Sequence, residues 1–162
     1  MLLTLTDGTA VSVRPIAPED KPLLADGLRR LSPRSAFRRF LTAKAHFTET
    51  ELRYLTEIDG HDHIAYVALR GGGLVAVGRL VKIAPDTADV AIVVGDPWQG
   101  LGLGAQLAAL LARRGADEGV TRIAATMLID NGPALRIMRR LGELVRDESS
   151  HGVREVVARL AV

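Results

Sequence analysis

The sequence predicts one α/β (α+β) domain over residues 1–162, with a mixed central sheet of six to seven strands and about four helices. Two observations carry this prediction. Apolar and polar residues alternate on both sides of Asp7-Gly8, a pattern typical of an antiparallel hairpin. Further along, an apolar strand at 88–94 is followed by a glycine-spaced turn, a helix and another strand at 122–127. That order requires a right-handed parallel crossover, so the sheet combines both kinds of pairing.

The other elements follow from start and stop signals in the sequence. Acidic residues open a helix at Pro18, and Ser32-Pro33 ends it. Thr48 and Glu51 form a capping box at the start of another helix, which ends near 58. The remaining expected elements are a short helix or turn at 34–40, strands at 63–69, 74–83 and 153–160, a helix from the glycine turn to about 119, and a helix at 133–141.

Length and composition limit the class of protein. A chain of 162 residues is long enough to bury about two-thirds of its unfolded surface in a single core. Its apolar fraction of 48% and charged fraction of 25% are ordinary for a soluble globular protein. A net charge of +2 indicates no general affinity for nucleic acid. Cysteine is absent, which excludes disulfides, cysteine-based metal sites and an acyl thioester on the enzyme, and we expect no metal.

The sequence contains no recognisable targeting or membrane segment. Residues 1–7 lack a basic stretch, and Asp7 interrupts their apolar run, so they do not resemble a secretory signal. No apolar run reaches the roughly eighteen residues that a membrane helix needs. We therefore expect a cytoplasmic protein without a membrane partner.

Three glycines follow the apolar strand that ends at Gly95-Asp96-Pro97. Gly100, Gly102 and Gly104 leave the start of the next helix free of side chains. The first N–H groups of a helix have no intrahelical partner and carry the positive end of its dipole. The turn therefore predicts a binding site for an anion with two or more phosphates.

Two common phosphate-binding motifs fit this turn poorly. A P-loop requires Gly-Lys-Ser/Thr, whereas Gly104 is followed by Ala105-Gln106. The dinucleotide pattern is matched loosely, but it needs an acidic residue after the next strand and further βα units. Asp130 lies too far along, and about thirty residues after it are too few for the second half of such a sheet.

The spacing Gln99-x-x-Gly102-x-Gly104 resembles the acetyl-coenzyme A pyrophosphate loop of the GNAT superfamily of N-acetyltransferases, whose form is Gln/Arg-x-x-Gly-x-Gly/Ala. The resemblance implies the GNAT fold, in which two parallel strands splay apart at the centre of the sheet. It also implies acetyl-CoA as co-substrate and a strand amide that polarises the thioester carbonyl. The coenzyme-binding residues it implies are Val93, Val94, Gln99, Gly100, Leu101, Gly102, Leu103, Gly104, Ala105 and Asn131.

The segment from Asn131 to Gly142 resembles the part of the family that contacts pantetheine. The Asn131 amide is expected to bond pantetheine, to cap the following helix, or to do both. Many relatives carry a tyrosine four residues before the closing glycine, and it protonates the leaving thiolate. Met138 stands at that position here and has no proton to donate.

Asp89 is the candidate catalytic base. It lies in the central strand, where the family frequently places a carboxylate that removes the amine proton directly or through water. Partial burial raises the pKa of such a carboxylate toward the operating pH. A solvated carboxylate without a role is the alternative reading, and Glu51 and Glu57 are alternative bases from the preceding helix.

A second resemblance concerns the acceptor. Leu31-Ser32-Pro33-Arg34-Ser35-x-x-Arg38-Arg39-Phe40 and the strand from His63 look like the acetyltransferase domain of bacterial Pat-type protein-lysine acetyltransferases. The likeness covers nearly the whole chain and implies a protein lysine as acceptor. A small-molecule amine and a catalytically impaired acyl-CoA sensor remain alternatives. The arginines between 29 and 39 are read as a solvated helix face, with an acidic protein surface, the coenzyme's 3′-phosphate or RNA as alternative ligands. For the protein as a whole we expect no nucleic-acid partner, and a homodimer is possible.

Overall fold

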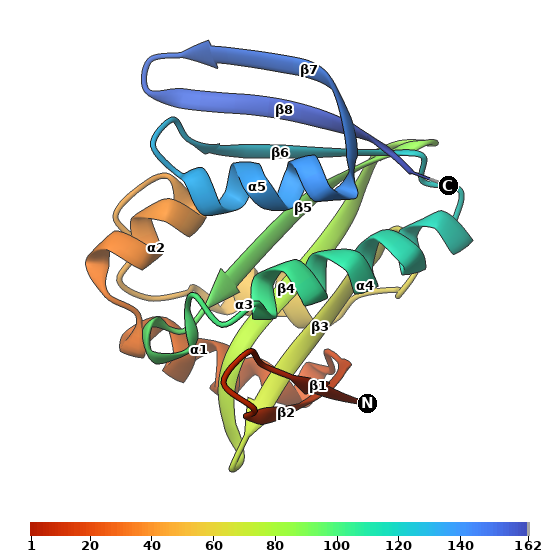
Figure 1. Ribbon diagram of the computed structural model, residues 1–162. Coiled ribbons are helices and arrows are strands. Elements are labelled where there is room, and N and C mark those ends of the chain that lie inside the picture. The colour runs from red at the N-terminus through yellow and green to blue at the C-terminus, as the bar shows by residue number, and fades with distance from the viewer. Residues whose placement is uncertain (162) are drawn as a thin grey trace.

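The computed structural model describes residues 1–161, which contain five α-helices and one sheet of eight strands in the order β1-β2-β3-β4-β5-β6-β8-β7 (Figure 1). The strands are β1 (Leu2–Thr4), β2 (Ala10–Pro15), β3 (His63–Arg70), β4 (Gly73–Ala84), β5 (Thr87–Val94), β6 (Arg122–Leu128), β7 (Gly142–Ser150) and β8 (Val153–Leu160). The helices are α1 (Lys21–Arg30), α2 (Pro33–Phe40), α3 (Glu49–Thr56), α4 (Leu103–Asp117) and α5 (Gly132–Leu141). Short 3-10 turns precede α1 and follow β5.

The central pair of strands separates after a short paired stretch. All neighbouring strands are antiparallel except β5 and β6, which run parallel as the crossover requires. Their pairing covers only Thr87 to Asp89 on β5 and Arg122 to Ala124 on β6. Figure 1 shows β6, β8 and β7 turning away from β5 beyond this junction. The sheet is therefore open at its centre, on the side toward the C-terminal ends of both strands.

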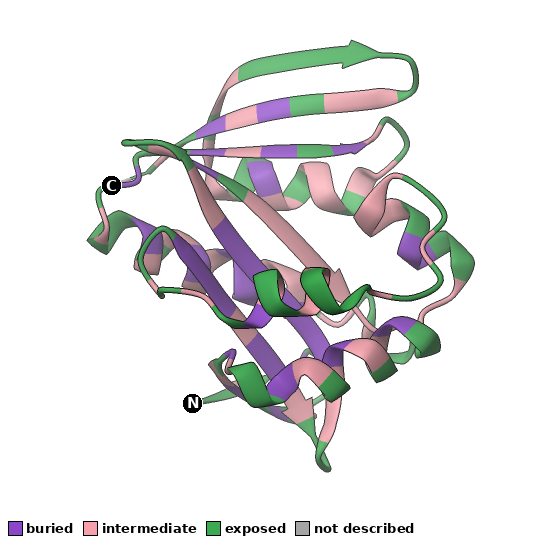
Figure 2. Ribbon diagram, turned by 180° about the vertical axis from the view of Figure 1, so that it is seen from behind, coloured by how far each residue is buried: buried purple, intermediate pink, exposed green. Residues whose placement is uncertain are grey.

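Helices cover both faces of the sheet. On one face, α4 and α5 pack through side chains such as Leu107, Leu111 and Met138, which are almost fully buried. On the other face, α1 and α3 pack over Val67 and Val77. Figure 2 shows the buried residues gathered on the central strands and on the inner side of the helices. Full burial of one such leucine contributes about 1.5–3 kcal/mol to stability.

The expected mixed sheet, with two parallel strands that splay apart at its centre, is confirmed, and so is the capping box at Thr48, whose hydroxyl accepts from Glu51 N at 3.1 Å. The expected number of strands and helices was too small. The missed strand is β7, which pairs with β8 through a turn at His151 and Gly152. Most of β7 is exposed and rich in charged residues, so it lacks the apolar alternation by which a strand is recognised.

The structure contains no helix, within residues 1–161, that is long and apolar enough to cross a membrane.

Candidate active site

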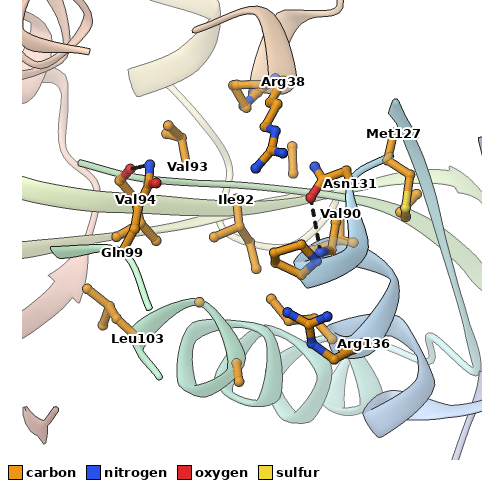
Figure 3. Close-up of a pocket in the computed structure, with 18 of the residues that line it drawn as sticks. Arg38, Val90, Ile92, Val93, Val94, Gln99, Leu103, Met127, Asn131 and Arg136 are labelled. Atoms are coloured by element: carbon orange, nitrogen blue, oxygen red, sulfur yellow. Dashed lines mark hydrogen bonds between the residues drawn. The ribbon is translucent and has the colours of Figure 1, made fainter. Parts of the chain in front are cut away.

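A cleft of about 490 Å³ occupies the gap between β5 and β6 (Figure 3). The amino ends of α4 and α5 form one side of it, and α2 lies across the carboxyl ends of the two strands. Its lining combines a strand wall, a glycine loop and basic side chains. The residues that matter below are Val90–Val94, Ala125–Met127, Ser35, Arg38, Arg39, Gln99, Gly100, Leu103–Ala105, Asn131, Arg136, Met138 and Arg140.

The edge of β5 that faces the cleft carries backbone groups without a strand partner. Gly95 N donates to Val75 O at 2.8 Å, so in this antiparallel pair the odd-numbered residues of β5 bond to β4. The N–H groups of Ile92 and Val94 therefore point to the side where β6 has diverged. Amides in this position are suited to polarise a thioester carbonyl. The sequence pointed to Val93 or Val94, whereas the register turns the Val93 amide into the ladder and makes Ile92 the second candidate.

The glycine loop presents the start of α4 to the cleft. Gly102 is the N-cap residue and has φ +85°, a left-handed conformation that other residues adopt at a cost. The first helical bond runs from Gln106 N to Gly102 O at 3.2 Å. The N–H groups of Leu103, Gly104 and Ala105 come before it and have no helical acceptor. Three free N–H groups at a helix start are suited to bind phosphate oxygens, and we call this group the glycine cradle.

Gln99 ties this loop to α2. Its Nε2 donates to Val94 O at 2.9 Å and to Ser35 Oγ at 3.0 Å. The Asp96 carboxylate accepts from Ser32 N at 2.7 Å and from the hydroxyls of Ser32 and Ser35. The Gln99 side chain therefore fixes the position of the loop, and the network joins the coenzyme side of the cleft to the helix on its other side.

Removal of the Asp96 carboxylate is expected to destabilise this junction. Asp96→Ala leaves two donors of Ser32, the residue before α2, and one of Ser35 without their acceptor, and we expect the free energy of unfolding to fall by about 2 kcal/mol. Urea denaturation measures the change. Asp117→Ala serves as control, because Asp117 is exposed at the end of α4. Equal losses in the two variants would contradict a structural role for the network.

Asn131 and two arginines complete the coenzyme side. Asn131 Oδ1 accepts from Ala134 N at 3.2 Å and caps α5, which leaves the side-chain NH2 available to a ligand. Arg136 and Arg140 extend from α5 into the lining, and Figure 3 shows Arg136 on the side of α4. These two arginines were not predicted from the sequence. Their spacing, four residues apart and starting five residues after Asn131, places both on one face of α5.

Asp89 is the last residue of β5 that pairs with β6. Its neighbours Val90 and Ala91 line the cleft, so the carboxylate lies beside the point where the gap opens. Asp89 stays exposed to solvent, yet partial burial of its carboxylate and the negative charge of Glu155 raise its pKa above the ordinary value. A carboxylate with a raised pKa at the mouth of the cleft suits a general base.

The two alternative bases are engaged elsewhere. Glu51 pairs with Lys44 and accepts from Thr48 N at 3.0 Å, which lowers the pKa of its carboxyl to about 2. Glu57 forms an ion pair with Lys21 at 2.8 Å, and that contact lowers its pKa too. Both carboxylates are held in ion pairs that lower their pKa, so both are poor candidates for a base.

Most of the residues implied for coenzyme binding meet at this cleft. Leu101 is the exception: it packs into the core beneath the loop, and its carbonyl accepts from Thr6 N at 3.0 Å. Met138 is 1% exposed and forms part of the wall. No tyrosine, histidine or carboxylate belongs to the cleft lining in residues 1–161.

The lining fits acetyl-CoA. Unpaired helix and strand amides, a glycine cradle and basic side chains match a ligand that carries several phosphates and an acyl thioester. The fold and the cleft are those of an acyltransferase. Residues 31–142 match the acetyltransferase (GNAT) family, and the chain belongs to that family.

Similar proteins and solved structures indicate which members of the family this chain resembles. The chain is 35% identical over 141 residues to acetyltransferase Pat from Mycolicibacterium smegmatis, and this match covers 84% of the chain and 42% of Pat. The crystal structure of the GNAT domain of S. lividans PAT superposes with a TM-score of 0.90 at 26% identity, covering 99% of this chain and 96% of that one. A cAMP-binding acyltransferase from Mycobacterium smegmatis gives a TM-score of 0.68 at 30% identity, covering all of this chain and 47% of that one. The chain thus spans less than half the length of Pat.

Proposed function

We propose that this protein transfers the acetyl group of acetyl-CoA to the side-chain amine of a lysine in a protein. The likeness to Pat along 84% of the chain carries the choice of acceptor. The unpaired edge of β5 and the glycine cradle support acetyl-CoA as the donor. Asp89 on the exposed side of the junction supports direct attack by an amine.

The chain's own groups divide the chemistry between them. When bound, acetyl-CoA supplies a thioester carbonyl that an amine nitrogen attacks. The N–H groups of Ile92 and Val94 donate to the carbonyl oxygen as negative charge develops on it. The Asp89 carboxylate accepts the proton that the amine must lose, directly or through water. A C–N bond forms, the C–S bond breaks, and coenzyme A leaves as a thiolate.

The proton for the thiolate comes from water in this proposal. Met138 occupies the wall where many relatives place a tyrosine, and a thioether has no proton to give. The Ser35 hydroxyl donates its proton to a hydrogen bond with Asp96, so it is not free to protonate the thiolate. A thiolate is a weak enough base to leave without prior protonation, and with a thiol pKa of about 8.5 it then takes a proton from water at neutral pH.

Calorimetric binding of acetyl-CoA, followed in the same sample by thiol release, tests the proposal. Capped lysine peptides, a lysine-containing protein and a panel of small amines serve as acceptors. We expect binding in every case and release with the peptides or the protein. Release with small amines alone would replace the lysine acceptor, and binding without release would favour a sensor. Absence of binding would refute the assignment of the cleft.

Substitution of Glu155 tests whether Asp89 is the base, because it should change the pH dependence of kcat/KM. Its negative charge raises the pKa of Asp89, so kcat/KM falls as the pH drops through that raised value. Glu155→Gln removes the charge and should lower the pKa, which moves the acidic limb of the profile to lower pH. A pH profile at saturating acetyl-CoA measures this. Glu148→Gln, an exposed change on β7, is the control, and identical limbs in both variants would count against Asp89.

A further inference from the structure

Arg79 is a buried arginine without an acidic partner among residues 1–161. It extends from β4 and is 5% exposed. Its Nη1 donates to Leu55 O at 3.1 Å and to His63 Nε2 at 2.9 Å. Burial and the charge of Arg79 lower the pKa of His63 to about 4, so the imidazole is neutral at pH 7. Both partners satisfy hydrogen bonds of Arg79, but neither neutralises its charge.

Arg39 brings a second positive charge to the same place. It lies on α2, with its guanidinium carbon 4.7 Å from the centre of the Phe40 ring. Burial, followed by the charge of Arg39, lowers the pKa of Arg79 to about 10, and burial lowers the pKa of Arg39 as well. Neither arginine forms an ion pair within the described chain. Two such charges in a poorly hydrated place attract an anion.

A small cavity holds both side chains. It measures about 60 Å³ and lies between α1 and the strands β4 and β5. Among the described residues that line it, only Arg39 and Arg79 are charged, and the others are apolar or glycine. Arg39 and Val93 line this cavity and the large cleft as well, so the two spaces adjoin. A ligand in the cleft can thus extend a short anionic arm into the small cavity.

The candidate base lies on the same face of the sheet. Arg79 pairs with Ala91 on β5, and Asp89 is two residues along that strand, so all three side chains share one face. The coenzyme residues on α4 and α5 lie on the opposite face. An acceptor that places its amine at Asp89 has the arginine pair on its own side of the sheet.

We propose that Arg39 and Arg79 bind a carboxylate of the acceptor, carried on a short apolar chain a few bonds from the reacting amine. This proposal rests on acetyl transfer to an amine as the function of the cleft. The small volume and apolar lining favour a flat carboxylate, which an arginine fork binds through two hydrogen bonds. The carboxylate belongs either to an acidic residue near the target lysine or to a free amine that carries its own acid group.

Matched acceptors separate these sources. One set is capped lysine peptides with glutamate at a single position from −2 to +2, each paired with its glutamine counterpart. The other is lysine and its amide. We expect at least one acidic acceptor to have a KM about tenfold below that of its neutral partner. Arg39→Gln should abolish the difference, and calorimetry measures its effect on acetyl-CoA affinity separately, because Arg39 also lines the large cleft. Arg34→Gln, an exposed change on the same helix, should preserve it.

The outcomes distinguish this site from the proposed function. Equal KM values for acidic and neutral peptides, unaffected by Arg39→Gln, would overturn the carboxylate site and leave lysine acetylation standing. An Arg39-dependent preference confined to free lysine would keep the site and refute the protein acceptor. Binding is followed separately by NMR of the arginine Nε–H signals. If no acidic acceptor shifts the Arg39 signal more than its neutral partner does, the proposal is wrong, whether or not turnover occurs.

Discussion

Gly102→Glu is expected to abolish acetyl-CoA binding, with at least a hundredfold loss of affinity. The substitution places a carboxylate at the amino end of α4, in the cradle of the Leu103, Gly104 and Ala105 amides. A negative charge beside a pyrophosphate costs several kcal/mol, and each 1.4 kcal/mol is a factor of ten. Calorimetry with acetyl-CoA measures the loss.

The strain of the left-handed backbone needs its own control. Glutamate at φ +85° costs about 1–2 kcal/mol of stability, whatever it does to the ligand. Gly119→Glu carries the same cost, because Gly119 has φ +87°, and it lies beyond the far end of α4 with no atom within 4 Å of an added Cβ. Both variants should unfold at similar urea concentrations, and only Gly102→Glu should lose the coenzyme. Retained affinity in Gly102→Glu would refute the phosphate cradle.

Asp89→Asn should lower kcat by about a hundredfold or more at neutral pH, the usual contribution of a positioned general base. The affinity for acetyl-CoA should be unchanged, because Asp89 lies outside the cleft lining. The wild-type rate rises with pH through the raised pKa of Asp89, since only the deprotonated form accepts a proton. The variant should lose this limb of the profile. Steady-state thiol release over a range of pH measures both effects.

Asp86→Asn is the matched control, because Asp86 is exposed in the turn just before β5. It should leave kcat and the pH profile unchanged. If Asp89→Asn retains the wild-type kcat, another group or bulk water acts as the base.

The sequence predicted the features that depend on local pattern. The glycine spacing after β5, the capping box at Thr48 and the polar cap at Asn131 each depend on residues within one turn, and the structure places all three as expected. The edge strand β7 was missed because its stability comes from pairing with β8 rather than from its own apolar pattern. A strand that depends on its neighbour in this way cannot be predicted from the periodicity of its own sequence.

The sequence could not predict which residues face each other across the site. The register between β4 and β5 decides which amides of β5 bond to β4 and which, such as those of Ile92 and Val94, point to the cleft. Arg39 and Arg79 are 40 positions apart and meet only because α2 folds over the carboxyl ends of the central strands. One signal was available: Arg79 lies in the middle of an apolar strand whose other charged residue, Lys82, is near the end. Burial of an unpaired charge is costly, so such a residue indicates that a group of opposite charge binds nearby.

The early separation of β5 and β6 also bears on the motions of the protein. Peptide groups on an unpaired strand edge exchange their hydrogens with solvent faster than those in a closed ladder. In the free protein, the amides of Ile92 and Val94 should therefore exchange quickly, although they lie at the centre of an eight-stranded sheet. In the proposed complex, the thioester would accept hydrogen bonds from these amides in place of a neighbouring strand. Coenzyme binding should slow this exchange and raise the melting temperature in proportion to the logarithm of its concentration.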